Sequence, residues 1–290
     1  MPSHDERCVA EIREALTQRI NLDGGWGYYA GHASRIEPTC WALLGLRASS
    51  RDETTALPAA AELFRTWQRE DGLLVEPLLQ NENRPNVAFN ALAAWLLVQR
   101  PELRAHVSLA KLVDGVTCAR GIRLPESTVN RQDDALQGWA WIDSTFSWVE
   151  PTCWALLALK AAAAIFPVVE TRINEGERLL IDRCCDSGGW NYGNSNMLGR
   201  TLRPYVPTTA VALLAMKERK GEACVERSLS FLKENRFAEP SAMALGLTIL
   251  ALRAFGETVA DVKEMLVAQW RRTQFLDNAH LMGLALYSLG

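Results

Sequence analysis

The sequence lacks any apolar run long enough to cross a bilayer, and it lacks an excess of positive charge. Its longest apolar stretch, residues 154–166, is interrupted by Lys160 and falls short of the roughly 20 apolar residues that a spanning helix needs. Lysine and arginine number 31 against 34 aspartates and glutamates, so no basic footprint for nucleic acid is present. The first residues are charged and lack the apolar core of a signal peptide. We therefore expect a cytoplasmic protein with no transmembrane segment and no nucleic-acid partner.

Cysteine is too irregularly spaced to build a disulfide framework or a thiolate metal site. The seven cysteines are an odd number with no C-x-x-C pair, and Cys184 and Cys185 are adjacent, which is poor geometry for zinc or for a disulfide between them. The sequence also lacks HExxH, GxSxG, P-loop and Rossmann fingerprints. We expect reduced thiols and predict no cofactor.

What the sequence does contain is an internal repeat. Residues 24–46, 139–159 and 188–216 can be laid over one another, and each runs from an aromatic loop through a proline into an apolar helix. Fainter copies occupy 84–98, 239–252 and 277–289. Self-similarity of this kind is typical of an array of helical hairpins.

The pattern predicts six apolar helices that alternate with six amphipathic ones. The apolar helices start near residues 38, 86, 151, 207, 240 and 278, and the amphipathic ones cover roughly 5–20, 56–69, 103–118, 168–184, 222–234 and 258–270. No segment shows strand-like alternation. The last helix is apolar to the terminus, which an open array would leave uncapped. We therefore predict an all-α fold, a single (α/α)6 toroid over residues 1–290, with a long insertion at about 119–147 at one mouth.

Three glutamates precede a proline at the start of an apolar helix: Glu37, Glu150 and Glu239. Proline and a carboxylate both favour a helix N-terminus, which is a purely structural explanation. The three copies fall in alternate hairpins, however, so a closed ring would direct them to one mouth. Desolvation and mutual repulsion would then raise at least one pKa and supply a general acid, although the helix dipole opposes this. Three converging carboxylates could instead hold a divalent cation.

The insertion and its neighbouring loops contain the remaining candidate binding residues. Acidic and aromatic side chains are interleaved there, which helix packing does not require, and a lid over the mouth or an ordered surface loop would each account for them. Two histidines are candidates for proton transfer or for helix capping: His32 in the first loop and His280 at the last apolar helix. The candidate binding residues are Trp139, Trp141, Trp148, Asp133, Asp134, Asp143, His32, Tyr192 and Tyr205.

The G-G-W loops at 24–26 and 188–190, the remnant of a Q-W repeat at 68–72, and the P-T-x-x-x-L-L helices resemble the prenyltransferase and squalene-cyclase repeat proteins. That resemblance implies an (α/α)6 toroid. Class II terpene cyclases of this group protonate their substrate with the middle aspartate of D-x-D-D-T-A. The segment 148–153 is similar, with Glu150 at the middle carboxylate and Thr152 at the threonine, but with Trp148 and Pro151 in place of the flanking aspartates.

The resemblance to protein prenyltransferase β subunits is weaker. Asp277 and His280 are similar to their histidine segment, but the preceding repeat has no Asp-x-Cys, so a zinc prenyltransferase is disfavoured. We expect a toroid that binds an isoprenoid or another apolar ligand, with acid-initiated cyclisation by Glu150 or Glu37 if it is an enzyme. A non-catalytic scaffold for a partner protein or peptide, and a carbohydrate-active enzyme of the same fold, are the alternatives.

Overall fold

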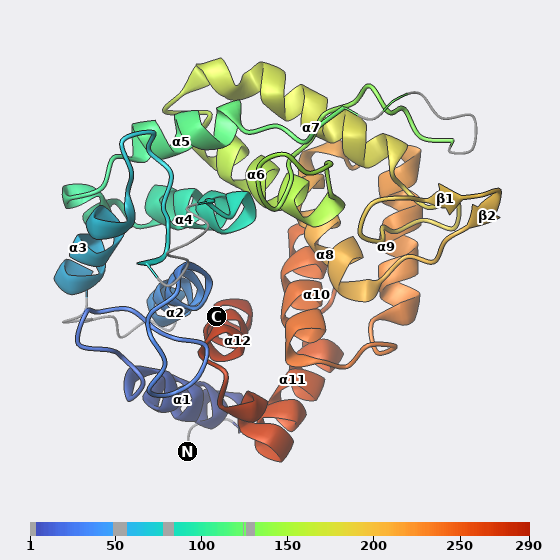
Figure 1. The fold of residues 1–290 in the computed structure, drawn as a ribbon. Coiled ribbons are helices and arrows are strands. Elements are labelled where there is room, and N and C mark those ends of the chain that lie inside the picture. The colour runs from blue at the N-terminus through green and yellow to red at the C-terminus, as the bar shows by residue number, and fades with distance from the viewer. Residues whose placement is uncertain (1–3, 49–56, 78–83, 124, 126–130) are drawn as a thin grey trace.

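The computed structural model describes residues 4–48, 57–77, 84–123, 125 and 131–290. Within them, helices form two concentric layers (Figure 1). The inner layer consists of α2 (Ile36–Ala48), α4 (Val87–Gln99), α6 (Val149–Ala162), α8 (Val206–Ala215), α10 (Ala242–Ala254) and α12 (Ala279–Leu289). The outer layer consists of α1 (His4–Thr17), α3 (Leu57–Trp67), α5 (Leu109–Cys118), α7 (Glu170–Asp182), α9 (Ala223–Asn235) and α11 (Ala260–Thr273).

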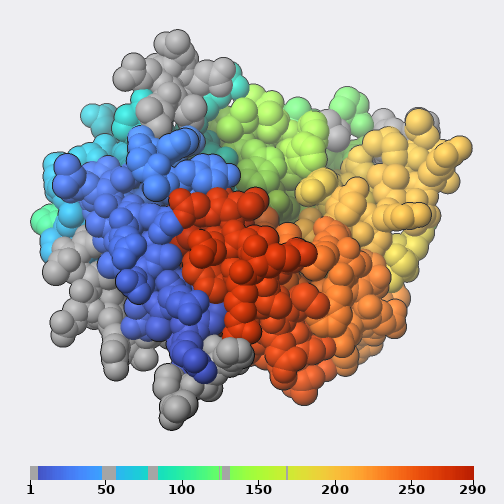
Figure 2. All heavy atoms as spheres, turned by 90° about the horizontal axis from the view of Figure 1, so that it is seen from below, coloured from blue at the N-terminus to red at the C-terminus, as the bar shows by residue number. Residues whose placement is uncertain are grey.

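The inner helices form a closed ring. Each contacts the next, and α12 packs against α2, so the two ends of the chain meet. Figure 2 shows this seam as the C-terminal segment lying directly beside the N-terminal one. The all-α toroid is therefore confirmed, and the inner helices start within two residues of the predicted positions.

Burial explains the two kinds of helix. Inner helices are covered on both sides, so α4 has buried residues on every face, and a helix apolar all round is stable there. Outer helices have one covered side: in α1, Cys8, Ile12 and Leu16 are buried while Arg7 and Glu11 are exposed. No described helix is both long and apolar enough to cross a membrane.

The closing seam depends on two glycines. A Cβ placed on Gly45 of α2 would lie 2.3 Å from the carbonyl oxygen of Gly283, and one on Gly283 of α12 would lie 2.5 Å from that of Trp41. Because these atoms belong to backbone, no side-chain rearrangement could relieve the contact. The absence of side chains at both positions lets the first and last inner helices approach closely enough to shut the ring.

The same hydrogen bonds recur in three loops and explain the repeat. Trp26, Trp139 and Trp190 are each completely buried between an outer and an inner helix. Their indole N–H groups donate to outer-helix carbonyl oxygens of Leu16, Val116 and Leu180, at 2.8, 2.7 and 2.7 Å. Their backbone N–H groups donate to the hydroxyls of Thr39, Thr152 and Thr209, at 2.9, 3.0 and 2.9 Å.

Connections between the layers are mostly loops and short 3₁₀ segments. The latter are η2 (Pro101–Ala105), η3 (Pro167–Val169), η4 (Lys217–Arg219) and η5 (Gln274–Asp277). The described residues contain one small antiparallel hairpin, β1 (Asn196–Met197) with β2 (Arg200–Thr201), in the loop before α8; such short strands have no alternation to detect. The insertion before α6 folds back on itself through isolated bridges between Ile122 and Phe146 and between Trp139 and Trp148.

Candidate functional site

The first turns of α2 and α6 carry the same pentapeptide, Glu-Pro-Thr-Cys-Trp, at 37–41 and 150–154. Residues four apart lie on one face of a helix, so Glu37 shares a face with Trp41, and Glu150 with Trp154. The two tryptophan rings meet edge to face, with centroids 5.7 Å apart. Both faces therefore point into the lumen, and the two carboxylates lie at the mouth where the inner helices begin.

The lumen beneath these carboxylates is occupied by an aromatic layer of Trp41, Trp95, Trp154, Tyr287 and His280. Neighbouring rings in it have centroids 5.6–6.4 Å apart. The imidazole of His280 is stacked on Trp41, with 14° between the planes. Four of the six inner helices contribute to the layer, which gives the mouth an aromatic base rather than an open channel.

Glu150 has the environment of a general acid. Its side chain is partly buried, and the indole nitrogen of Trp154 is 3.5 Å from Oε1. Burial raises its pKa from 4.5 to about 7, and the charge of Glu37 adds to that rise. The dipole of α6 acts in the opposite direction, but desolvation is the larger effect here.

Glu37 lies in a small polar network. The hydroxyl of Tyr28 donates to Oε2 at 2.5 Å, and Nδ1 of His280 lies 3.7 Å from the same oxygen. Burial and the neighbouring Glu37 raise the pKa of Tyr28 well above its ordinary value, so it remains a donor at accessible pH. The sequence pattern selected Glu37 and His280 but missed Tyr28, which lies two residues after the tryptophan of the first G-G-W motif.

Glu239 does not join the pair, which corrects the expectation of three converging carboxylates. Helix α10 begins at Ala242, so Glu239 precedes the helix, and its Oε1 accepts the backbone N–H of Val206 at 2.9 Å. It thus caps the neighbouring helix α8, as Glu76 caps α2 through Ile36. Among the described residues, no three His, Cys, Asp or Glu side chains are grouped to hold a metal ion.

Three of the predicted aromatic residues do come together. Trp148, Tyr192 and Tyr205 line a cavity of about 600 Å³ between the loops that lead into α6 and α8, which we call the rim cavity. Phe146 lies against Trp148 at 4.7 Å between ring centroids, and Tyr192 against Tyr205 at 5.0 Å. Trp148 immediately precedes α6 and Glu150 lies in the first turn of that helix, so one short segment contributes both a residue of the rim cavity and the acid, although Glu150 itself does not line the cavity.

The other predicted binding residues are placed differently. Trp139 is completely buried in the wall, with Arg172 over its ring at 3.8 Å, so it packs rather than lining the mouth. Trp141 is partly buried against Phe89. The remaining four have other surroundings. Asp143 is exposed, and His32 is exposed beside the ring of Tyr29. The backbone N–H of Asp133 donates to the carboxylate of Asp182, and the side chain of Asp134 is buried and accepts a hydrogen bond from Gln132.

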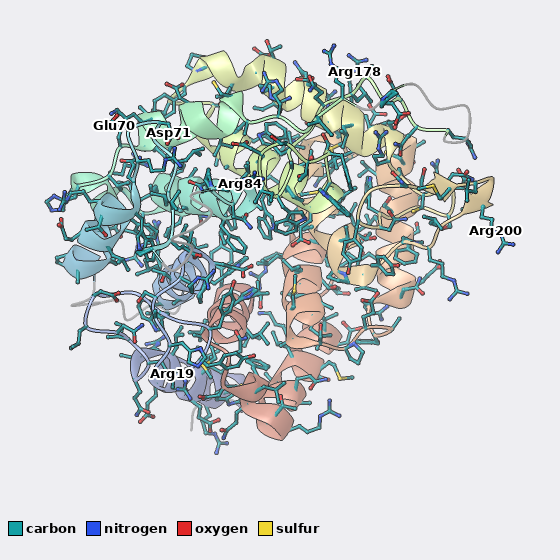
Figure 3. The ribbon with its side chains drawn as sticks, viewed as in Figure 1. Arg19, Glu70, Asp71, Arg84, Arg178 and Arg200 are labelled. Carbon is teal, nitrogen blue, oxygen red and sulfur yellow. The ribbon has the colours of Figure 1, made fainter. Side chains whose placement is uncertain are left out.

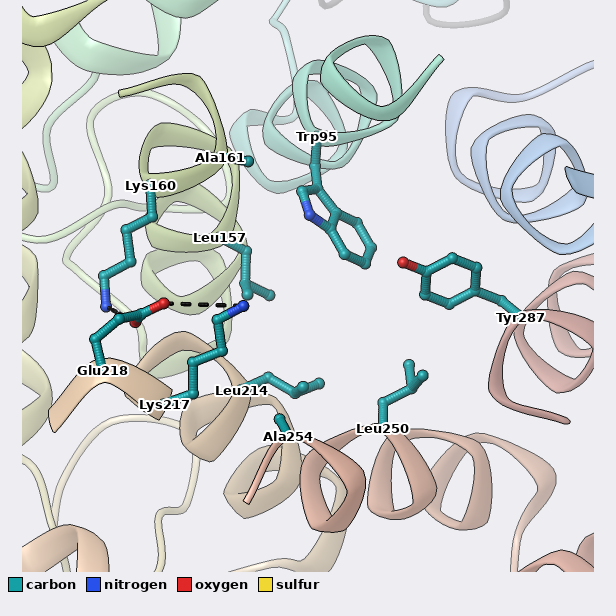
Figure 4. A pocket seen from close by; sticks show the side chains of 10 residues that line it. All are labelled: Trp95, Leu157, Lys160, Ala161, Leu214, Lys217, Glu218, Leu250, Ala254 and Tyr287. Atoms are coloured by element: carbon teal, nitrogen blue, oxygen red, sulfur yellow. Dashed lines mark hydrogen bonds and ion pairs between the residues drawn. The ribbon is translucent and has the colours of Figure 1, made fainter. Parts of the chain in front are cut away.

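A second cavity of about 260 Å³ lies at the opposite end of the lumen (Figure 4). Its apolar walls include Leu157, Leu214 and Leu250, and the Lys160–Glu218 ion pair, at 2.8 Å, borders it. Lys160 is ten residues after Glu150 on α6, about 15 Å along the axis. Trp95 and Tyr287 line this cavity and belong to the aromatic layer, so that layer separates it from the acid.

Comparison with known proteins finds no matching family model. The chain is 27% identical over 239 residues to drimenyl diphosphate synthase from Streptomyces showdoensis, which covers 79% of this chain but only 40% of that protein. The fold is similar to an α-amylase from Clostridium perfringens (TM-score 0.68, 9% identity, covering 100% and 99% of the two chains). It is also similar to an α-1,6-mannanase of Salegentibacter (0.66, 10%, 98% and 98%) and to a type II terpene cyclase from Scytonema (0.59, 15%, 99% and 98%).

These likenesses confirm the resemblance to the terpenoid-cyclase repeat proteins, in fold over nearly the whole chain and in sequence over part of it. The identities with solved structures are low, so those likenesses concern the fold alone. The same toroid occurs in the mannanase and in the cyclase. The fold therefore does not indicate which kind of reaction a toroid supports, and the argument for this chain has to come from the side chains at its mouth.

Proposed function

We propose that this toroid binds an isoprenoid at its mouth and starts the cyclisation of that substrate by proton transfer from Glu150. The observation that carries the proposal is a carboxylic acid with a pKa of about 7 set directly above an aromatic layer. At neutral pH a large fraction of Glu150 is protonated, and a general acid is most effective when its pKa lies near the working pH.

The reaction can be written with all atoms and charges balanced. Glu150 gives its proton to the terminal double bond of the isoprenoid, and the resulting tertiary cation is attacked by the next double bond, which forms a ring. The aromatic faces of Trp41 and Trp154 stabilise the positive charge. The last cation loses a proton to a carboxylate oxygen of Glu37, beside His280. The product is an isomer of the substrate, and proton exchange with water resets both groups.

The comparisons support the same chemistry. The sequence relative is named as a synthase of drimenyl diphosphate, and the cyclase from Scytonema has been solved with geranylgeranyl dihydroxybenzoate as substrate. Because the chain spans well under half of the synthase's length, the activity of that whole protein is a proposal for this one.

The test is turnover of farnesyl and geranylgeranyl diphosphate, followed by dephosphorylation and gas chromatography with mass detection. We expect cyclic isomers that gain one deuterium per molecule when the reaction is run in D₂O. Glu150→Gln should lose activity by at least about 100-fold, the usual contribution of a general acid. Glu239→Gln is the matched control and should stay active, because Glu239 only caps α8. Full activity in Glu150→Gln would refute the mechanism.

Carbohydrate processing is the second candidate, because two carboxylates share the mouth of a fold that the mannanase also has. Glycosidases of both stereochemical classes need such a pair. Release of reducing sugar from starch or α-1,6-mannan, abolished by Glu150→Gln, would favour it. Binding of an isoprenoid or of a partner protein without turnover would favour the non-catalytic alternative.

A further inference from the structure

The outer layer contains a pair of thiols that the proposed reaction does not use. All seven cysteines lie within the described residues and are free; five are buried, and only Cys118 and Cys184 are exposed or partly exposed. Cys184 follows helix α7, which ends at Asp182, and Cys224 lies in the first turn of α9. A contact between Cys184 and Cys224 therefore joins segments that are 40 residues apart in the chain.

Hydrogen bonds hold these two cysteines in one cluster. Their side chains are hydrogen-bonded to each other, and Sγ of Cys184 lies 3.9 Å from the backbone carbonyl oxygen of Cys224. The hydroxyl of Ser228 lies 3.7 Å from the sulfur of Cys184 and donates to the carbonyl of Cys224 at 2.6 Å. The two sulfur atoms are thus already neighbours, which is the first requirement for a disulfide.

The cluster makes Cys184 the more reactive thiol of the pair. The hydrogen bond with Cys224 lowers the pKa of Cys184 most, and Ser228 acts in the same direction. The charge of Arg227 also favours the thiolate, whereas burial and the charge of Asp186 oppose it. The same hydrogen bond and burial raise the pKa of Cys224. Because the thiolate is the nucleophile, Cys184 reacts first and Cys224 keeps its proton until then.

The sulfur of Cys184 can be reached from outside the ring. Helices α7 and α9 both belong to the outer layer, and Arg178 of α7 is exposed and points away from the ring (Figure 3). Cys184 is partly exposed, whereas Cys224 is only 7% exposed. A small oxidant can therefore reach Cys184 directly, while Cys224 stays covered.

We propose that Cys184 and Cys224 are a redox-active pair that a hydroperoxide converts reversibly into a disulfide. The thiolate of Cys184 attacks one oxygen of the peroxide; an S–O bond forms, the O–O bond breaks, and hydroxide or alkoxide leaves. The sulfur of Cys224 then displaces hydroxide from this sulfenic acid, and its proton leaves with that hydroxide as water. The two thiols are oxidised and the peroxide is reduced. An added dithiol restores both thiols by disulfide exchange.

The disulfide would secure the loop that contributes to the rim cavity. The hydroxyl of Ser228 accepts the backbone N–H of Gly189 at 2.7 Å, and the same loop continues to Asn191 and Tyr192, which line the rim cavity. The thiol cluster therefore holds the start of this loop against α9, and oxidation would make that attachment covalent. The inference goes beyond the proposed cyclisation and does not depend on it.

The experiment treats the full chain with hydrogen peroxide, alkylates the remaining thiols in denaturant and identifies the tryptic peptides by mass spectrometry. We expect Cys184 and Cys224 to escape alkylation, because peptide 184–200 is joined to peptide 221–227. Dithiothreitol should separate the two peptides. The oxidised protein should also melt at least about 5 °C higher than the same sample after dithiothreitol, because the bond closes a long loop.

Three variants assign the two roles. Cys224→Ser should stop at the sulfenic acid, which dimedone traps on Cys184, and should show no shift in melting temperature. Cys184→Ser should leave Cys224 unoxidised. Cys185→Ser is the matched control and should form the same disulfide, because burial raises the pKa of Cys185 to about 11.

Three results would overturn the proposal. The first is faster oxidation of Cys118, which is the more exposed thiol. The second is a link that uses Cys185 in place of Cys184. The third is oxidation of Cys184 in the wild type that proceeds to the sulfinic acid without a link to Cys224.

Discussion

Replacing Glu150 with glutamine should change the pH dependence of stability in a defined direction. Burial raises the pKa of Glu150 from 4.5 to about 7, so between these values the folded protein holds a proton that the unfolded chain has released. The stability that this group confers is therefore present below pH 4.5 and is lost as the pH rises through 7. Glutamine is neutral throughout and cannot be ionised inside the mouth.

The size of the effect follows from the shift. Each pKa unit corresponds to about 1.4 kcal/mol, so ionising Glu150 in the folded protein costs at most about 3 kcal/mol above pH 7. Glu150→Gln should thus be close to the wild type in stability near pH 4.5. At pH 8.5 it should be more stable by up to about 3 kcal/mol, which raises the melting temperature by about 5 °C in a chain of this size.

The assay is urea unfolding of both proteins at several pH values between 5 and 8.5, followed by circular dichroism. Glu239→Gln is the control: it removes a carboxylate that caps α8 and should lower stability by about 1 kcal/mol. A difference between Glu150→Gln and the wild type that is the same at pH 5 and pH 8.5 would refute the reasoning, because it would mean that Glu150 ionises as freely in the folded protein as in water.

Three other substitutions test the packing of the ring, each by urea or thermal unfolding. Thr209→Val leaves a buried backbone N–H without its acceptor and should lower the free energy of unfolding by about 1–3 kcal/mol. An unchanged free energy of unfolding would show that the hydrogen bond between the loop and the Thr209 hydroxyl is dispensable. Gly283→Ala places a Cβ against backbone at the α2–α12 seam and should cost about 1–3 kcal/mol, whereas Gly221→Ala, with no atom within 4 Å, should cost well under 1 kcal/mol. Lys160→Met removes a cation 2.7 Å from the buried carboxylate of Glu177 and should lower the free energy of unfolding by about 3 kcal/mol. An unchanged free energy of unfolding would mean that Arg219 alone is sufficient to pair with that carboxylate.

Local patterns identified most of the architecture. Helices apolar on every side can be stable only between two layers, and amphipathic ones only on the outside, so the alternation of the two kinds predicts the ring. The first and last hairpins meet through Gly45 and Gly283, which the sequence shows only as two glycines in apolar helices. Closure was predicted from the apolar last helix, but the contact that permits it is visible only in three dimensions.

The site could be predicted only in part, because short motifs fix residue type and helix position but not distance. The repeated Glu-Pro-Thr-Cys-Trp identifies Glu37 and Glu150 as equivalent. Glu239 has the same first two residues, but its helix begins later, at Ala242, and its side chain caps α8 instead. Trp139 looks like a mouth residue by its acidic surroundings, yet its buried hydrogen bonds make it a copy of Trp26.

The helical repeat, the ring and the first turns that carry the acids can thus be predicted from the residues alone, since these depend on periodicity and on residues within one or two turns of each other. Which side chains meet across the lumen depends instead on how the helices pack in three dimensions. The effect of Glu37 on the pKa of Glu150, the approach of His280 to Glu37 and the rim cavity between the loops before α6 and α8 all involve segments that are distant in the chain. Desolvation and electrostatic interaction depend on distances between such elements, and a repeat pattern contains no information about those distances.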